Sequence, residues 1–313
     1  MSIYDINGNS LQASALYVNV KDFGAKGNGS TDDYSSIQSA IDSIKTTGGT
    51  IFFPKGTYIT NSTLRFYSNQ HFIFDAMAIL ETGNSSLDAL LLGYVDDSTG
   101  GYSGLENVII EGGSFQRGSR TGGMTLVGVS HAKNITFLNC KFGSTAAWHN
   151  LEINGSEHCK VINCYFEGSN KTSSSACLLQ LDEMSSSGNY PWDDVGLFDG
   201  TRCNDIEIVG CWFENCSRAP FIGSHSNSGT NVRIHGCFFD NNTGERGAIN
   251  FNTLSNLDVY DNTFKDCTTG IDFDSSGASS CAVYNNRFTG VTTAIDSSIS
   301  VQHANWINGT YTA

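Results

Sequence analysis

A ten-residue pattern that occurs seven times constrains the fold of this chain more than any other feature. Residues 133–142 read KNITFLNCKF, and related stretches begin at residues 106, 157, 204, 230, 255 and 279. Every copy ends in phenylalanine, and its eighth position is Gly113, then a cysteine in four copies, then Asn262 and Asn286. Copies start about 24 to 27 residues apart except once, which is a period typical of a solenoid.

The local pattern within each copy indicates which solenoid this is. Apolar residues alternate, as in Ile135 and Phe137 or Ile206 and Ile208, which predicts strands rather than helices. Armadillo and tetratricopeptide repeats need helix pairs, and leucine-rich repeats need a Leu/Asn consensus that is absent here. We therefore predict an all-β, single-stranded parallel β-helix, in which the phenylalanines and cysteines stack internally about 4.8 Å apart.

Composition and charge exclude several classes of protein. The 313 residues, 39% of them hydrophobic, suffice for one large β domain without a second one. The net charge of −14 argues against a nucleic acid partner, which would require a basic stripe. No apolar run is long enough to cross a membrane, and the opening MSIYDING lacks the pattern of a signal peptide. The ten cysteines lie in strand columns and form no CxxC motif, which favours reduced, buried thiols.

The chain divides into a short opening and one long domain. We expect residues 1–16 to be a leader or attachment segment and residues 17–313 to form the β-helix, with rungs at about 50–300. A helix is expected at about 31–46, with Thr31 as its cap, Asp32 and Asp33 in its first turn, and Gly48 after its end. Such a helix would cover the open end of the first rung.

Here a family resemblance becomes specific. The string DFGAKGNGSTDDYSSIQSAID, followed by GGTIFFPKGTY, resembles the opening of the pectate-lyase-like right-handed parallel β-helices. That resemblance implies the hand of the helix and its capping helix, and it covers about 290 residues. It does not select a reaction, because the family includes lyases, hydrolases, epimerases and inactive binders.

A second strand precedes each copy and places polar residues on the outer face. If Leu151 and Ile153 and their equivalents point inward, the residues between them point outward. One outward column then reads Glu152, Gln180, Gly223, Asn250 and Asp272, and the next reads Asn154, Asp182, His225, Asn252 and Asp274. Residues 184–203 form a long excursion that should stand as a wall beside this face, with aromatic side chains suited to sugar rings.

The pieces HNLE, QLD, FDGTRC, Ser217-Arg218 and IGSHS also resemble phage and Gram-positive bacterial β-helix proteins that act on cell-surface glycans or teichoic acids. This chain departs from that pattern in having Ala219, Pro220 and Phe221 between Arg218 and the IGSHS piece. The candidate catalytic residues are Glu152, Asp182, His225, Asp199 and Arg218. The candidate substrate-binding residues are His149, Asn150, Asn154, Gln180, Trp148, Tyr190, Trp192, Asn250 and Asn252.

These residues predict an enzyme that cleaves a bacterial surface carbohydrate polymer in a groove on the outer face, as a phage or prophage tail spike does. Two carboxylates suit a glycoside hydrolase, while the histidine and arginine equally suit a phosphodiesterase or a uronate lyase. A non-catalytic receptor-binding spike is the alternative. No cofactor is identified. Asp and Asn side chains can hold Ca²⁺, but no EF-hand-like spacing supports a calcium site. We expect a virion tail location or release by lysis after cytoplasmic assembly, and a homotrimer by analogy with spikes.

Overall fold

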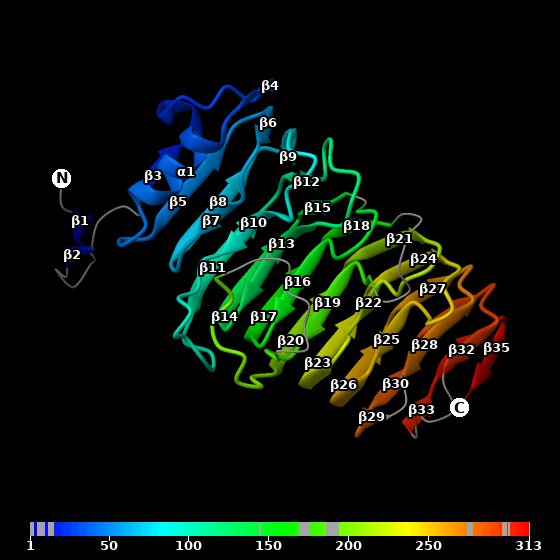
Figure 1. The fold of residues 1–313 in the computed structure, drawn as a ribbon. Helices are drawn as coiled ribbons and strands as arrows, with labels where there is room; N and C mark the ends of the chain where they lie inside the picture. The colour runs from blue at the N-terminus through cyan, green and yellow to red at the C-terminus, as the bar shows by residue number, and fades with distance from the viewer. Residues whose placement is uncertain are drawn as a thin grey trace.

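The computed structural model describes residues 3–4, 10–11, 16–143, 145–168, 176–185, 194–273, 278–295, 299 and 301–312. The chain winds as a right-handed parallel β-helix, with its two termini at opposite ends of the solenoid (Figure 1). Near the N-terminus, β1 (Ile3–Tyr4) and β2 (Ser10–Leu11) form a separate antiparallel pair. The predicted fold class is confirmed. Among the described residues no helix is long and apolar enough to cross a membrane.

Three long sheets form the walls of the solenoid. Sheet I contains β3 (Tyr17–Asn19), β5 (Gly49–Phe53), β8 (Gln70–Phe74), β11 (Leu105–Glu111), β14 (Ala132–Leu138), β17 (Glu157–Ile162), β20 (Cys203–Val209), β23 (Asn227–His235), β26 (Thr253–Tyr260), β29 (Ala278–Ser279), β30 (Ala282–Tyr284) and β33 (Val301–His303). Sheet II contains β4 (Asn28–Asp32), β6 (Gly56–Thr60), β9 (Ala78–Thr82), β12 (Ser114–Gln116), β15 (Lys141–Phe142), β18 (Tyr165–Glu167), β21 (Trp212–Cys216), β24 (Phe238–Asn242), β27 (Thr263–Lys265), β31 (Arg287–Thr289), β34 (Asn305–Ile307) and β35 (Thr310–Thr312). Sheet III contains β7 (Leu64–Phe66), β10 (Ala89–Gly93), β13 (Thr125–Ser130), β16 (Leu151–Asn154), β19 (Leu179–Asp182), β22 (Ile222–Gly223), β25 (Ile249–Phe251), β28 (Thr269–Phe273) and β32 (Thr293–Ile295).

Each rung contributes one strand to each sheet in turn, and equivalent residues pair in parallel. Each repeated motif supplies a strand of sheet I and the start of a strand of sheet II, and the preceding strand belongs to sheet III. Phe142 pairs with Phe166 in sheet II, and Leu151 pairs with Leu179 in sheet III. The register therefore stacks equivalent residues, as the repeat predicts.

Phenylalanines form a continuous column inside the solenoid. Ring centroids lie 4.7 Å apart between Phe142 and Phe166, 4.6 Å between Phe166 and Phe213, and 5.1 Å between Phe213 and Phe239. The interplanar angles in these three pairs are 15°, 8° and 11°, so the rings stack nearly parallel. All four side chains are fully buried, which makes the column a main part of the hydrophobic core.

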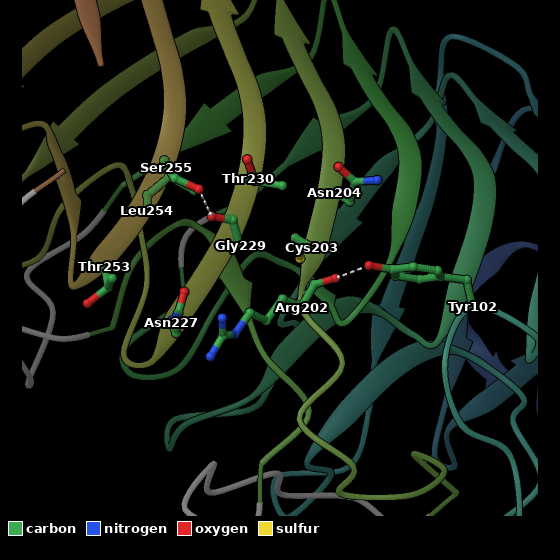
Figure 2. A pocket seen from close by; sticks show the side chains of 10 residues that line it. All are labelled: Tyr102, Arg202, Cys203, Asn204, Asn227, Gly229, Thr230, Thr253, Leu254 and Ser255. Carbon is green, nitrogen blue, oxygen red and sulfur yellow. Dashed lines mark hydrogen bonds between the residues drawn. The ribbon is translucent and has the colours of Figure 1, made fainter. Parts of the chain in front are cut away.

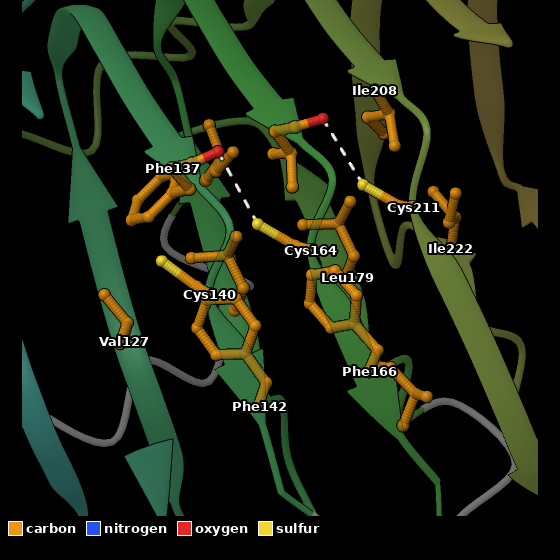
Figure 3. Packing of buried hydrophobic residues seen from close by; sticks show 14 of the residues in the cluster. Val127, Phe137, Cys140, Phe142, Cys164, Phe166, Leu179, Ile208, Cys211 and Ile222 are labelled. Carbon is orange, nitrogen blue, oxygen red and sulfur yellow. Dashed lines mark hydrogen bonds between the residues drawn. The ribbon is translucent and has the colours of Figure 1, made fainter. Parts of the chain in front are cut away.

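The neighbouring column changes from thiol to amide along the chain. Figure 3 shows Cys140, Cys164 and Cys211 beside the phenylalanines, and these thiols donate weakly to buried backbone carbonyls. Asn262 accepts from the backbone of Cys237 at 2.9 Å, and Asn286 accepts from the backbone of Asn262 at 3.0 Å. All ten cysteines are free and buried, which confirms the expectation of reduced structural thiols.

The N-terminal helix differs in its boundaries from the predicted one. Helix α1 spans Tyr34–Ser43, and Thr31 lies in β4 rather than at the helix cap. Asp33 occupies the cap position, but its carboxylate accepts from the backbone of Lys26 and Gly27 and bonds no helix N–H. Ile37 and Ile41 of α1 are fully buried and belong to the same hydrophobic core as the rungs.

The stacked column predicts a large effect of truncating one ring. Replacing the fully buried Phe213 with alanine should lower the free energy of unfolding by about 3 to 5 kcal/mol, through lost burial and a cavity between its neighbours. Denaturant titration measures this change. The adjacent Trp212→Ala is the matched control, because Trp212 points outward and is 46% exposed. If Phe213→Ala lowers the free energy of unfolding no more than Trp212→Ala does, the phenylalanine column does not stabilise the fold.

Candidate functional site

The outer face of sheet III is buried in its middle strands. Every residue of β13, β16 and β19 is buried, whereas β7 and β28 in the same sheet, and β14 in sheet I, include partly exposed positions. Glu152 is 3% exposed and Asp182 is 2% exposed. The sequence-based picture of these carboxylates lining an open groove is therefore wrong, because outward orientation on a strand does not guarantee contact with solvent.

Described parts of the excursion after β19 account for some of this cover. Asp194 forms an ion pair of 3.2 Å with Arg65 on β7, although Asp194 follows β19 in the chain. Arg65 belongs to the same outward column as Glu152 and Gln180, through successive register partners in sheet III. The excursion therefore reaches back across several rungs, as a wall beside this face would.

The buried side chain of His131 contacts the same excursion where sheet III passes into sheet I. The two ring nitrogens of His131 lie 2.7 Å from the Gly101 carbonyl oxygen and 2.8 Å from the Leu197 carbonyl oxygen. The ring therefore links the loop at Gly101, which precedes β11, to the excursion at Leu197. Sequence reasoning missed His131, whose position directly after a strand carries no catalytic motif.

The structure shows the first predicted outward column from Glu152 to Asp272. It shows the second only for Asn154 and Asp182, because the strand that would pair with Asp182 ends at Gly223, before His225. Glu152 pairs with Gln180 and Asn154 pairs with Asp182 across adjacent rungs. Gln180 pairs with Gly223, Gly223 with Asn250, and Asn250 with Asp272. Glu152 and Asp182 lie on adjacent rungs and in neighbouring columns. This diagonal places their Cα atoms roughly 8 Å apart.

Glu152 is a buried carboxyl group with two side-chain donors. Thr125 donates to its Oε1 at 2.5 Å, and Asn154 donates to its Oε2 at 3.1 Å. Burial raises the pKa of Glu152 to about 7, with a smaller contribution from the charge of Asp182, while the two hydrogen bonds act in the opposite direction. A carboxyl group with this pKa can act as an acid or a base near neutral pH. Thr125 was not identified from sequence.

Asp182 connects the end of one rung to the loop of the next. Its Oδ1 accepts from the backbone N–H of His225 at 2.8 Å, and from the backbone and hydroxyl of Ser226 at 3.0 and 2.9 Å. Its Oδ2 accepts from the Gln180 amide. The Asp182 carboxylate thus replaces the strand pairing that ends at Gly223, and it holds the backbone of His225 in place.

His225 brings this cluster to the surface. Its side chain is 38% exposed, and its Nδ1 lies 4.0 Å from Asp182 Oδ2, beyond hydrogen-bond distance. Its ring centroid lies 5.3 Å from that of His149, whose Nδ1 is 2.7 Å from the Cys177 carbonyl oxygen. The structure therefore brings Glu152, Asp182, His225 and His149 into one region, which we call the acid–histidine cluster.

Two acceptor atoms in this region have no hydrogen-bond partner. They are Asn154 Oδ1 and Gln180 Oε1, and both atoms are buried. Buried polar atoms are rarely left unpaired in folded proteins, and exceptions concentrate where a ligand or water completes the site. Hydroxyl groups, which sugars carry on almost every carbon, are suitable donors to both atoms.

Other predicted site residues have different positions. Asn150 points into the solenoid, where it accepts from Thr145 at 3.0 Å and donates to the Gly143 carbonyl at 2.8 Å, so it is a structural residue. Trp148 lies against Gly123, and Asn252 donates to the His225 carbonyl at 3.1 Å. Tyr190, Trp192 and Asp274 lie outside the described residues.

Asp199 and Arg218 have local surroundings that differ from those expected. Asp199 accepts from the Gly101 backbone at 2.9 Å and from the Thr201 hydroxyl at 2.6 Å, which joins two loops. Burial raises its pKa, but these hydrogen bonds outweigh burial, so the pKa of Asp199 is lowered overall. Arg218 is exposed in the bend between β21 and β22. No described contact joins either residue to Glu152 or Asp182, and we leave both out of the proposal below.

The described residues contain no group of three or more His, Cys, Asp or Glu side chains placed to hold a metal ion.

Comparison with known proteins identifies the family. The family model named rhamnogalacturonase A/epimerase, pectate lyase-like, matches residues 17–173, which is half of the chain. The chain belongs to this family. The match begins at β3 and includes α1 and the rungs up to β18, so it covers Glu152 but not Asp182 or His225.

Two curated relatives and one solved structure illustrate how far the likeness extends. Over 72% of its length the chain is 25% identical to the plasmin and fibronectin-binding protein A of Streptococcus pneumoniae, covering 36% of that protein. Over 85% of its length it is 25% identical to the preneck appendage protein of Bacillus phage PZA, covering 28% of it. The crystal structure of PfbA, a surface adhesin of S. pneumoniae, matches with a TM-score of 0.64 and 17% identity, over 89% of this chain and 79% of that one. The chain thus spans about a third or less of these curated relatives.

The raised pKa of Glu152 predicts a pH-dependent stability. Below about pH 4.5 the residue is protonated in both states, whereas between about 4.5 and 7 the folded state keeps a proton that the unfolded state has lost. Stability should therefore fall as pH rises through this window, by on the order of 3 kcal/mol from this group. Glu152→Gln removes this titration, so denaturant titrations of both proteins at pH 4.5 and 7.5 should show a smaller fall for the variant. An equal fall in both would contradict the assignment.

Proposed function

We propose that this protein cleaves a bacterial cell-surface carbohydrate polymer, using the acid–histidine cluster on the outer face of sheet III. The observation that carries the proposal is a buried Glu152, whose pKa is raised to about 7, with a second carboxyl group, Asp182, on the next rung in the neighbouring column. Glycosidases commonly use two carboxyl groups with different surroundings, and so with different pKa values, to transfer protons during cleavage of a glycosidic bond. Membership of a family named for a rhamnogalacturonase and an epimerase supports a glycan as the substrate class.

Each residue of the cluster has a distinct task in this proposal. Glu152 gives its proton to the leaving oxygen, since its raised pKa keeps a proton available near neutral pH. Asp182 orients His225 through the backbone N–H at 2.8 Å, and the exposed imidazole meets the substrate first. Asn154 Oδ1 and Gln180 Oε1 accept from sugar hydroxyls, which gives both buried acceptors a partner. These assignments fit a hydrolase, and a lyase or phosphodiesterase would use the same histidine as its base.

A non-catalytic receptor-binding role is the second candidate, and the burial of the carboxyl groups favours it. Glu152 and Asp182 are almost fully covered, and the likeness to an adhesin of S. pneumoniae supports a binding function for a β-helix of this type. A binder would hold its glycan without shortening it. Measuring product formation beside binding therefore separates the two candidates.

Substitutions in the cluster test the enzymatic proposal. Wild-type protein should release reducing ends, unsaturated ends or phosphate from at least one purified bacterial wall polymer. Glu152→Gln and His225→Ala should each lower turnover at least about 100-fold, since each removes a proton-transfer group. Asp182→Asn should lower turnover similarly and also destabilise the fold by about 1 to 3 kcal/mol, because a buried acceptor of several hydrogen bonds is altered.

The control is Asp272→Asn, in the same outward column as Glu152 but on a more distant rung. Its turnover should remain near the wild-type value, provided that all variants are compared at a temperature where they are folded. Intact cleavage in Glu152→Gln and His225→Ala, or equal damage in the control, would reject this cluster as the catalytic site.

We further propose that the protein is part of a phage or prophage tail appendage and forms a homotrimer there. The likeness to a preneck appendage protein of a phage supports this location. Sedimentation equilibrium should give three times the mass of the 33.7 kDa chain. A monomer at micromolar concentration would contradict the trimer without affecting the catalytic proposal.

A further inference from the structure

A surface hollow lies beside the acid–histidine cluster, where sheet III passes into sheet I. Its volume is about 510 Å³, enough for a sugar residue and its substituents. Figure 2 shows polar side chains around it, and those that matter here are Tyr102, Arg202, Asn204, Asn227, Thr230 and Ser255. The sequence analysis assigned none of these six residues to a site.

The hollow is joined to the cluster through the chain on both sides of Asp182. Asp182 binds the backbone of His225 and Ser226, and the next residue, Asn227, lines the hollow. Glu183, which follows Asp182, accepts from Arg202 Nε at 3.2 Å. One residue, Ser226, therefore separates His225 from the lining of the hollow along the chain.

Arg202 is the one charged residue among the described residues that line this hollow, and its side chain is 54% exposed. It is a cation in a chain whose net charge is −14, and it forms an ion pair with Glu183. Glu183 occupies the Nε side of the guanidinium. With the Asn227 side chain turned so that its oxygen faces Arg202, that oxygen accepts from Nη1 and Nη2 at 3.3 and 3.1 Å. A guanidinium has five N–H groups, so two Nη hydrogens remain for an anionic oxygen.

A row of short polar side chains extends from this charge. Asn204, Thr230 and Ser255 are register partners on β20, β23 and β26, so they repeat about every 4.8 Å along the solenoid. The register of β23 shifts between Asn227 and Gly229, and bulges of this kind re-aim side chains next to functional sites. Gly229 has a φ of +116°, and a Cβ there would lie 1.8 Å from the Cys203 carbonyl oxygen. The bulge that presents Asn227 to the hollow therefore requires glycine.

We propose that this hollow is a subsite for an acidic sugar residue, which carries a carboxylate or phosphate group that Arg202 binds. Asn204, Thr230 and Ser255 would bind hydroxyls of the same residue or of its neighbour. The inference rests on the proposed function only for the claim that the ligand is a glycan. It adds that the polymer is anionic, although the charge of the whole chain disfavours anions.

Equilibrium binding tests the subsite independently of cleavage. The probes are polygalacturonate and its carboxyl-reduced neutral form, and a purified wall teichoic acid with a neutral dextran as its phosphate-free counterpart, all measured by biolayer interferometry. Wild-type protein should bind at least one acidic probe at least tenfold more tightly than its neutral counterpart. Arg202→Gln should abolish that preference, because a charge-assisted contact is worth at least a factor of ten. Which acidic probe binds distinguishes carboxylate from phosphate.

Two further variants keep the test decisive. Arg287→Gln removes the same charge from an exposed position on sheet II, and it should bind like wild type. Thr230→Tyr fills the hollow and leaves the Arg202–Glu183 pair intact, so it should weaken binding even if Arg202→Gln perturbs folding.

The possible failures have different meanings. Absence of binding to either acidic probe, or unchanged binding in both Arg202→Gln and Thr230→Tyr, overturns the subsite. Binding that depends on Arg202 without any cleavage keeps the subsite and rejects the enzyme. Cleavage that requires Glu152 but not Arg202 keeps the enzyme and rejects the subsite.

Discussion

In-register parallel pairing is the constraint on which the rest of this structure depends. Because each rung hydrogen-bonds to the next with equivalent residues opposite each other, a residue type that recurs with the repeat becomes a column. Phe142, Phe166 and Phe213 stack at 4.6 to 4.7 Å for this reason, close to the spacing of the strands themselves. The same register that builds the core also aligns the polar residues outside it.

On the outer face of sheet III, the surroundings of a residue decide its chemical properties. Glu152 would be an ordinary carboxylate on an exposed strand, but cover over this face raises its pKa to about 7. Asp182, one rung further on, accepts backbone and hydroxyl hydrogen bonds from His225 and Ser226 instead. Two carboxyl groups on neighbouring strands thus acquire different properties from their surroundings alone.

The hollow around Arg202 is also lined by side chains that repeat with the register of the solenoid. One arginine lines the hollow in a chain with a net charge of −14, and Glu183 pairs with its Nε, which leaves Nη hydrogens for a ligand. A long polymer contacts several rungs at once, so recognition can be divided among short side chains that repeat with the register. A β-helix is suited to this division because its rungs present equivalent positions at a fixed interval.

The sequence by itself determined the solenoid, the register and the outward column from Glu152 to Asp272, because strand alternation and a 24- to 27-residue repeat leave few other ways to bury the phenylalanines. Only the tertiary structure decided which outward residues are covered, Glu152 among them. The hydrogen bonds of His131 and the ion pair of Arg65 with Asp194 depend on where the excursion lies, and no periodic pattern encodes that path. Asn150 points inward for a similar reason: the chain bends before β16, so strand alternation does not apply there. Local periodicity fixes direction, whereas exposure depends on contacts between residues distant in the chain.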